Sequence, residues 1–365
     1  MSFYAVFAII LFFLIYTAIC YYVGFNGWVW LKATRLRINK WVYIGIITFL
    51  SLSMFIGQFS LFLPIKIIGY LWIVVIGYSL ILLPLANILV FFLKRRGVLW
   101  IGLTIIGAFL FLFGFGLYNA WTPVVRTYDI NINKNTDAEV VKIMMASDLH
   151  LGQIVGEKHL QKLVDIANEV QPDMILIPGD LIDDYIEPYI EKDLGKTMAK
   201  LKAPLGVYAV SGNHDYYGDD LEILVEEVEK AGITMIMDES LLIHDDFYLV
   251  GRNDLTDEKR KEVREIVRDL DHSKPIIMMD HQPKDLDIAE ENGVDLLLSG
   301  HTHRGQMAPA HLITSRIFEN DWGYLQKGSL HSLVSSGFGT WGPPLRIGSQ
   351  AEVMVINLKF ESTRN

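Results

Sequence analysis

The first 120 residues contain no Asp or Glu, and this absence constrains the fold more than any other feature of the sequence. Four apolar stretches fill this region, at residues 3–24, 41–63, 67–93 and 98–120. Each is long enough to cross the hydrocarbon core of a bilayer as a helix, which takes about 20 apolar residues. A cleavable signal peptide does not explain four such stretches. We therefore predict an all-α transmembrane region of four helices over residues 1–120.

Basic residues between these stretches predict an orientation. The first and third loops hold seven of them and the second loop only Lys66; the seven are Lys32, Arg35, Arg37, Lys40, Lys94, Arg95 and Arg96. Because Lys and Arg are retained on the cytoplasmic side, we expect loops one and three inside the cell. In a plasma membrane, both termini and the domain after residue 120 are then expected outside the cytoplasm. The stretches hold no ionisable residues suited to an ion pathway, so an anchor is favoured over a transporter.

Residues 121–365 form a second, acidic part of the chain. They carry 24 basic and 42 acidic residues, a formal net charge of −18. Such a domain repels phosphate backbones at long range, so we expect no nucleic-acid partner. The single cysteine, Cys20, lies in the first apolar stretch, which excludes an intramolecular disulfide and any cysteine-based zinc site.

After residue 140, short β-rich apolar runs alternate with amphipathic segments, which is typical of a layered α/β domain. Strands are expected at residues 140–147, 174–178, 206–210, 233–237, 248–251, 275–279, 295–298, 332–335 and 352–358. Helices are expected at residues 159–169, 221–230, 257–269 and 284–292. Carboxylate, amide and imidazole side chains follow five of these strands, and ligand sites of open α/β sheets form at the carboxyl ends of strands.

Five motifs carry these side chains. In chain order they are Asp148-Leu149-His150, Gly179-Asp180-Leu181-Ile182-Asp183, Gly212-Asn213-His214-Asp215, Asp280-His281 and Gly300-His301-Thr302-His303. Together they resemble the calcineurin-like metallophosphoesterase superfamily. Residues 335–349 further resemble its bacterial branch of membrane-associated or exported phosphoesterases. The resemblance implies a four-layer α/β/β/α sandwich over residues 121–365 and metal-dependent hydrolysis of a phosphoric ester or anhydride.

The resemblance also implies seven ligands for two divalent ions. Asp148, His150 and His303 would hold the first ion, Asn213, His281 and His301 the second, and Asp180 would bridge them. Physically, two ions about 3.5–4 Å apart need an anionic bridge and flanking oxygen and imidazole ligands. Such ligands suit Mn²⁺, which we favour, as well as Fe²⁺ or Zn²⁺. A hydroxide between the ions would attack phosphorus in line.

Further residues receive roles beside this site. His214 resembles the family's histidine that touches the phosphate and protonates the leaving oxygen as a general acid. We expect Asp215 to orient the His214 imidazole and Asp183 to support a ligand. Arg304 stands where the bacterial branch often has glycine; it would clamp a second phosphate or a carboxylate, or pair with a surface acid. His159 and His311 are expected to be ordinary core or surface residues.

Two classes of function follow. The first is a membrane-anchored hydrolase of a phosphomonoester, phosphodiester or pyrophosphate, with the bilayer as partner and a phosphorylated lipid or envelope-linked molecule as substrate. The second is a catalytically silent metal-binding sensor or scaffold at the membrane. His214 favours turnover, because a silent module would be expected to have lost this acid or a ligand. A UDP-diacylglucosamine-type pyrophosphatase becomes the alternative if the domain is cytoplasmic.

Overall fold

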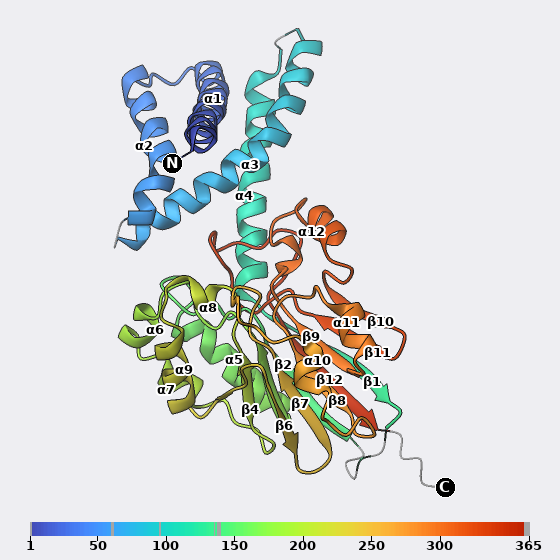
Figure 1. Cartoon of the computed structure of the whole chain (residues 1–365). Coiled ribbons are helices and arrows are strands. Elements are labelled where there is room, and N and C mark those ends of the chain that lie inside the picture. Colours follow the sequence, from blue (N-terminus) through green and yellow to red (C-terminus); the bar gives the residue numbers. More distant parts are fainter. Residues whose placement is uncertain (1, 60–61, 95, 135, 137–139, 361–365) are drawn as a thin grey trace. The chain divides into compact units, whose positions relative to one another are not determined.

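The computed structural model of the chain describes residues 2–59, 62–94, 96–134, 136 and 140–360 (Figure 1). Two compact units make up the chain. The membrane unit comprises Met1–Gly114 and Gly342–Pro344, and the catalytic unit comprises Phe115–Trp341 and Leu345–Asn365. Arg95, one of the basic residues used for the orientation, lies outside the described residues, as do residues 60 and 61 of the second apolar stretch.

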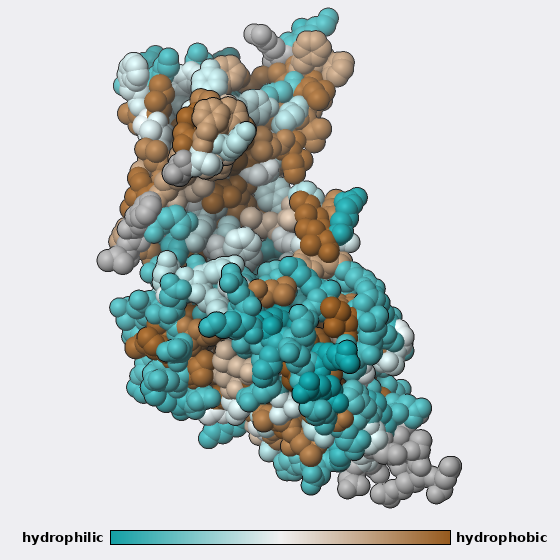
Figure 2. Space-filling view, in the orientation of Figure 1, coloured by the Kyte–Doolittle hydropathy of each residue, from teal (hydrophilic) through white to brown (hydrophobic). Residues whose placement is uncertain are grey.

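Four long apolar helices cover the first 121 residues, as predicted: α1 (Phe3–Ala33), α2 (Lys40–Phe59), α3 (Leu63–Phe92) and α4 (Val98–Trp121). Figure 2 shows the hydrophobic side chains that dominate the surface of the membrane unit. Three boundaries differ from the sequence prediction by four residues or more: α1 continues nine residues further, α2 ends four residues earlier, and α3 begins four residues earlier. Lys32 and Lys66 consequently lie in helical end turns instead of loops. Pro84 lies inside α3, which continues on both sides of it.

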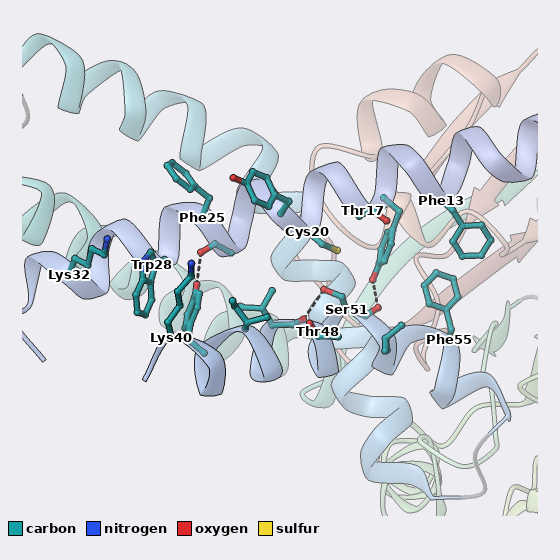
Figure 3. A pocket seen from close by; sticks show the side chains of 17 residues that line it. Phe13, Thr17, Cys20, Phe25, Trp28, Lys32, Lys40, Thr48, Ser51 and Phe55 are labelled. Carbon is teal, nitrogen blue, oxygen red and sulfur yellow. Dashed lines mark hydrogen bonds between the residues drawn. The ribbon is translucent and has the colours of Figure 1, made fainter. Parts of the chain in front are cut away.

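Helices α1 and α2 border a cavity of about 760 Å³ (Figure 3). Aromatic side chains line much of it, and Lys32 and Lys40 lie towards one end. Two hydrogen bonds join the helices here: the Tyr16 hydroxyl donates to the Ser51 carbonyl, and the Tyr43 hydroxyl donates to the Gly24 carbonyl, each at 2.6 Å. Such interhelical bonds stabilise helix pairs in an apolar environment.

Two six-stranded sheets form the centre of the catalytic unit. The first has the order β1-β12-β2-β3-β4-β5, with β1 (Val124–Ile132), β2 (Val140–Met145), β3 (Met174–Pro178), β4 (Val207–Val210), β5 (Thr234–Met235) and β12 (Glu352–Phe360). The second has the order β10-β11-β9-β8-β7-β6, with β6 (Glu239–Ile243), β7 (Phe247–Gly251), β8 (Ile276–Met279), β9 (Leu296–Ser299), β10 (Gly323–Lys327) and β11 (Leu330–Val334). Strands β2 to β5 pair in parallel, as do β7, β8, β9 and β11, so their carboxyl ends share one edge of each sheet.

Helices cover the outer face of each sheet and give the predicted four layers. On the first sheet lie α5 (Glu157–Val170), α7 (Gly195–Met198) and α9 (Leu221–Lys230), and on the second lie α10 (Val263–Val267) and α11 (Leu286–Glu291). Alternation along β2 shows how one strand serves two layers, because Met144 packs under the helices while Ile143 and Met145 face the other sheet. The remaining short helices are α6 (Glu187–Glu191), α8 (His214–Tyr217), the 3₁₀ turn η1 (His303–Gly305) and α12 (His311–Ile317).

The predicted helix at residues 257–269 is too long, since only α10 forms there. Side-chain acceptors take the backbone N–H groups of the preceding residues: Lys259 donates to Asp257 and Lys261 donates to Asp238. These local bonds compete with helical ones. Strands β1, β6 and β10 were not predicted; β1 and β10 alternate exposed and less exposed residues, and β6 has only one buried residue, Ile243.

Candidate metal centre

All seven expected ligands lie just beyond the carboxyl ends of parallel strands, as their spacing predicted. Five of them have a positive φ between 45° and 70°: Asp148, His150, Asp180, His301 and His303. This left-handed conformation is costly for residues other than glycine, and it clusters at functional sites. Hydrogen bonds between neighbouring turns hold it in place, since the Asp148 and His150 N–H groups donate to the carbonyls of Gly179 and Asp180, each at 3.0 Å.

Asp148, His150 and His303 form one group of side chains with ligand atoms within reach of a single ion. The Nε2 atoms of His150 and His303 lie 3.0 Å apart, and His303 Nε2 lies 3.3 Å from Asp148 Oδ1. All three side chains are buried. Burial by itself raises the pKa of Asp148, but His303, together with His281 and His150, holds this pKa far below its ordinary value. The carboxylate is therefore ionised and able to ligate.

Asp180, Asn213, His281 and His301 form a second group. His281 Nε2 lies 3.2 Å from Asp180 Oδ2 and 3.2 Å from Asn213 Oδ1, and His301 Nδ1 lies 2.9 Å from the same Asn213 oxygen. Asp180 Oδ2 is also 3.7 Å from His150 Nε2, so its carboxylate lies between the two groups. This position suits a bridging ligand.

Hydrogen bonding around His281 makes the second group a suitable cation site. The Pro178 carbonyl can only accept, so the contact of 2.8 Å requires that His281 Nδ1–H donates to it. In the neutral ring, Nε2 then presents a lone pair towards the Asp180 and Asn213 oxygens. Burial lowers the pKa of His281, but Asp180 raises it well above the ordinary value, so positive charge is favoured here. The Asp180 and Asn213 oxygens and the His281 Nε2 lone pair therefore converge, and such oxygen and imidazole ligands suit a divalent ion.

His214 is oriented by a different carboxylate from the one we predicted. Its Nδ1 atom lies 2.6 Å from Asp184 Oδ1, whereas the Asp215 oxygens accept the Gly212 and Ile182 N–H groups at 2.7 and 3.1 Å. Burial lowers the pKa of His214, but the hydrogen bond to Asp184 and the charge of Asp180 raise it to about 9. Burial and Asp180 raise the pKa of Asp215 to about 7. Asp215 therefore shapes the loop before His214 without contacting its ring through a hydrogen bond.

Asp183 lies close to the centre, with a carboxylate oxygen within 4.8 Å of nitrogens of His150 and His214. Asp184 was missed because it lies outside the family motif, four residues after Asp180. An acidic pair at the end of this motif was the signal available in the sequence.

Arg304 stacks on an aromatic ring at the rim of the site. Its guanidinium lies 3.9 Å from the centre of the Trp322 ring, which also contacts Arg126 at 5.2 Å. Trp341 lies near His214, and the centres of the two rings are 6.3 Å apart.

Arg346 is buried beneath the first group. It donates to the carbonyls of Ser336, Gly337 and Gly339, and its Nη2 atom lies 3.1 Å from His303 Nδ1. From the sequence, Arg346 was only one residue of the segment 335–349 that resembles the bacterial branch. In the structure, it ties this loop to the His303 ring.

Comparisons with known proteins agree with this geometry. The sequence profile described as calcineurin-like phosphoesterase matches residues 141–305. A metallophosphoesterase of Aquifex aeolicus is 32% identical over 245 residues, which cover 64% of this chain and 91% of the relative. One from Helicobacter pylori is 31% identical over 263 residues, covering 69% of this chain and 70% of the relative. The chain belongs to the calcineurin-like phosphoesterase family.

Some relatives of this metallophosphoesterase are named for membrane spans as well. A protein of Danio rerio named transmembrane protein with metallophosphoesterase domain is 31% identical over 263 residues, covering 67% of this chain and 60% of the relative. The four apolar helices and these relatives identify the present metallophosphoesterase as a membrane protein.

Proposed function

We propose that this metallophosphoesterase holds two divalent ions and hydrolyses a phosphate ester or pyrophosphate of a lipid or envelope-linked molecule. In this proposal Asp148, His150 and His303 bind one ion, and Asn213, His281 and His301 bind the other. Asp180 binds both. The observation that carries the proposal is the position of the Asp180 carboxylate, with Oδ2 3.2 Å from His281 Nε2 and 3.7 Å from His150 Nε2.

The bound ions, for which we favour Mn²⁺, would supply Lewis acidity that lowers the pKa of a water nucleophile and offsets phosphate charge. The chain itself fixes the ligands before substrate arrives. Asp180 is held by the His214 N–H, which donates to its Oδ1 at 2.9 Å, and Asp148 is held by the His301 N–H, also at 2.9 Å. Such preorganised dipoles need no rearrangement as charge develops in the transition state.

His214 is proposed to protonate the leaving oxygen. A pKa near 9 keeps its imidazole protonated at neutral pH, and Asp184 fixes the ring by accepting from Nδ1–H. Nε2–H is then the proton available for transfer. Arg304 is proposed as an outer contact for a second phosphate or a carboxylate, because a guanidinium stacked on Trp322 retains an N–H edge for bidentate binding.

Orientation is part of the proposal. The basic residues near the first and third helix connections favour a cytoplasmic location for both, and the catalytic unit then lies outside the cytoplasm. Alkaline phosphatase fused after Asn365 should be active, and green fluorescent protein fused there should not fluoresce. The opposite pair of results would place the unit in the cytoplasm and favour a nucleotide-linked lipid such as UDP-diacylglucosamine.

Turnover tests the proposed chemistry directly. Full-length protein in detergent with Mn²⁺ should hydrolyse p-nitrophenyl phosphate or its bis-ester, and lipid phosphates in mixed micelles. His214→Ala should lower turnover by about 10² or more while Mn²⁺ binding is retained. Metal binding without any hydrolysis would contradict the proposal and favour the silent sensor or scaffold.

A further inference from the structure

Helix α12 exposes an apolar face at the rim of the metal centre. The exposed fractions of Leu312, Ile313 and Ile317 are 51%, 61% and 64%, and Figure 2 shows hydrophobic side chains gathered over this helix. Residues 301–318 contain no Asp or Glu, although they belong to a strongly acidic part of the chain, and they include Arg304 and Arg316. Apolar side chains flanked by basic ones are typical of helices that lie in a membrane interface.

The catalytic unit contains the end of a membrane helix. The last two turns of α4 belong to this unit, where Gly116, Asn119 and Ala120 are buried. The Asn119 side-chain amide donates to the Arg346 carbonyl at 3.1 Å, and the Arg346 N–H donates to the Gly116 carbonyl at 3.0 Å. Tyr118 and Trp121 lie in the last turn of α4, and Tyr and Trp are enriched where spanning helices leave the bilayer. The catalytic unit therefore includes the end of α4 at which this helix is expected to leave the bilayer.

Backbone hydrogen bonds of Arg346 and Ile347 connect α4 to the segment just before α12. Ile347, next to Arg346, donates its N–H to the Gln306 carbonyl at 2.9 Å and accepts from the Ala308 N–H at 2.5 Å. Helix α12 begins at His311, three residues after Ala308. These contacts within the catalytic unit hold α12 close to the C-terminal end of α4, where α4 is expected to leave the bilayer.

Other contacts tie α12 to the metal ligands. The Phe318 ring, directly after the helix, lies 5.8 Å from the His301 ring. Asp321 links the two segments, because its carboxylate accepts from the Thr314 hydroxyl at 2.7 Å and its carbonyl accepts from the Thr302 hydroxyl at 2.6 Å. A bilayer in contact with α12 would therefore lie next to the loop that carries His301 and His303.

We propose that α12 inserts Leu312, Ile313 and Ile317 into the boundary between head groups and acyl chains of the bilayer that α4 spans. The metal centre then takes the phosphate of a bilayer lipid while the acyl chains stay in the membrane. The substrate part of this inference rests on the proposed function, whereas the membrane contact does not. Seven residues are too few for a strong membrane anchor alone, but α4 keeps the helix at high effective concentration beside the bilayer.

Fluorescence quenching tests the membrane contact. Full-length protein with Cys20→Ser and Ile313→Cys is labelled with bimane and reconstituted into phosphatidylcholine and phosphatidylglycerol vesicles containing brominated lipid. The matched control is Leu242→Cys, because Leu242 is 42% exposed on β6 and pairs with Tyr248 near the start of β7, away from the ligand-bearing edge. Strong quenching at position 313 and little at 242 is expected. Equal, weak quenching at both positions would overturn the proposal.

Turnover tests the consequence for substrate. The triple substitution Leu312→Gln, Ile313→Gln and Ile317→Gln should lower hydrolysis of vesicle-borne phosphatidic acid or diacylglycerol pyrophosphate by about tenfold or more. Hydrolysis of soluble bis(p-nitrophenyl) phosphate should stay at the wild-type level, as should both activities of Leu242→Gln. Equal lipid turnover by the triple variant and this control would overturn the inference. If wild-type protein hydrolysed neither substrate, the proposed function would fail, and the quenching result would still decide the membrane contact.

Discussion

The Nδ1 atom of His214 lies 2.6 Å from the Oδ1 atom of Asp184, within a site where Asp180 contributes a further negative charge. This pairing keeps the imidazole protonated and points its second nitrogen away from Asp184. A carboxylate outside the recognised motif therefore orients the residue that we assign as the general acid.

Substitution of Asp184 should affect poor leaving groups most. Asp184→Asn removes the charge that stabilises the His214 imidazolium, so turnover of an alkyl phosphate ester should fall by about tenfold or more. A p-nitrophenyl ester needs little protonation of its leaving oxygen and should be affected much less. Steady-state rates on both esters provide the measurement, with the exposed Asp219→Asn as control. Equal losses on the two esters would argue against an acid role for His214.

Close backbone approach, rather than unusual backbone angles, explains two of the motif glycines. Of Gly179, Gly212 and Gly300, Gly179 has a positive φ of +82°. Gly212 and Gly300 have no positive φ, but a Cβ atom on either would collide with the carboxylate of Asp180 or Asp148, respectively.

Gly300→Ala should accordingly reduce metal binding and turnover at least tenfold, because Asp148 must move away from its ligand position. Gly156→Ala is a matched control, since the nearest atom to its Cβ would be 4.0 Å away. Metal content by mass spectrometry and turnover with Mn²⁺ provide the measurements. Wild-type metal content in Gly300→Ala would show that the Asp148 position is not restricted as the structure indicates.

Stability should depend on pH through His159, a buried residue that packs against Phe338 and Trp121. Burial lowers the pKa of His159 to about 4, with a partial opposing effect from its bond to the Phe338 carbonyl. The unfolded chain, with a pKa near 6.5, binds this proton more readily. The stability contributed by the neutral ring is therefore complete above pH 6.5 and is lost as pH falls towards 4.

The loss amounts to about 3 kcal/mol at most over that window. His159→Gln, which can retain a donor to Phe338 but does not titrate, removes this dependence. The unfolding temperature of wild-type protein in detergent should fall more steeply between pH 6.5 and 4 than that of the variant. Parallel curves for the two proteins would contradict the assignment.

Much of the metal centre was predictable, because its ligands follow strands whose apolar runs are unambiguous. Strand β3 and helix α9 match their predicted bounds, and the motif residues meet at the expected sheet edge. Asp184 was not predictable by spacing alone, since the choice between neighbouring carboxylates depends on the turn after Asp180. In that turn Asp184 has a positive φ of 67°, and the N–H of Asp183 donates to the Leu151 carbonyl.

Elements at the margins of the domain were harder to predict from local pattern. Strand β1 alternates exposed residues such as Thr127 with half-buried ones such as Arg126 and obtains its hydrogen bonds from β12, more than 220 residues later. Helix α12 carries its apolar residues on an exposed face, so no core-facing pattern marks it. The partner of β1 is distant in the sequence, and the proposed partner of α12 is lipid.

Metal stoichiometry with turnover tests the central claim most directly. Full-length protein is stripped with chelator and then titrated with Mn²⁺ by calorimetry, while hydrolysis of bis(p-nitrophenyl) phosphate is followed in the same samples. We predict two ions per chain, recovery of turnover with the metal, and loss of both in Asp180→Ala. Full turnover in the stripped protein, or wild-type metal binding and turnover in Asp180→Ala, would contradict a dinuclear hydrolase centred on Asp180.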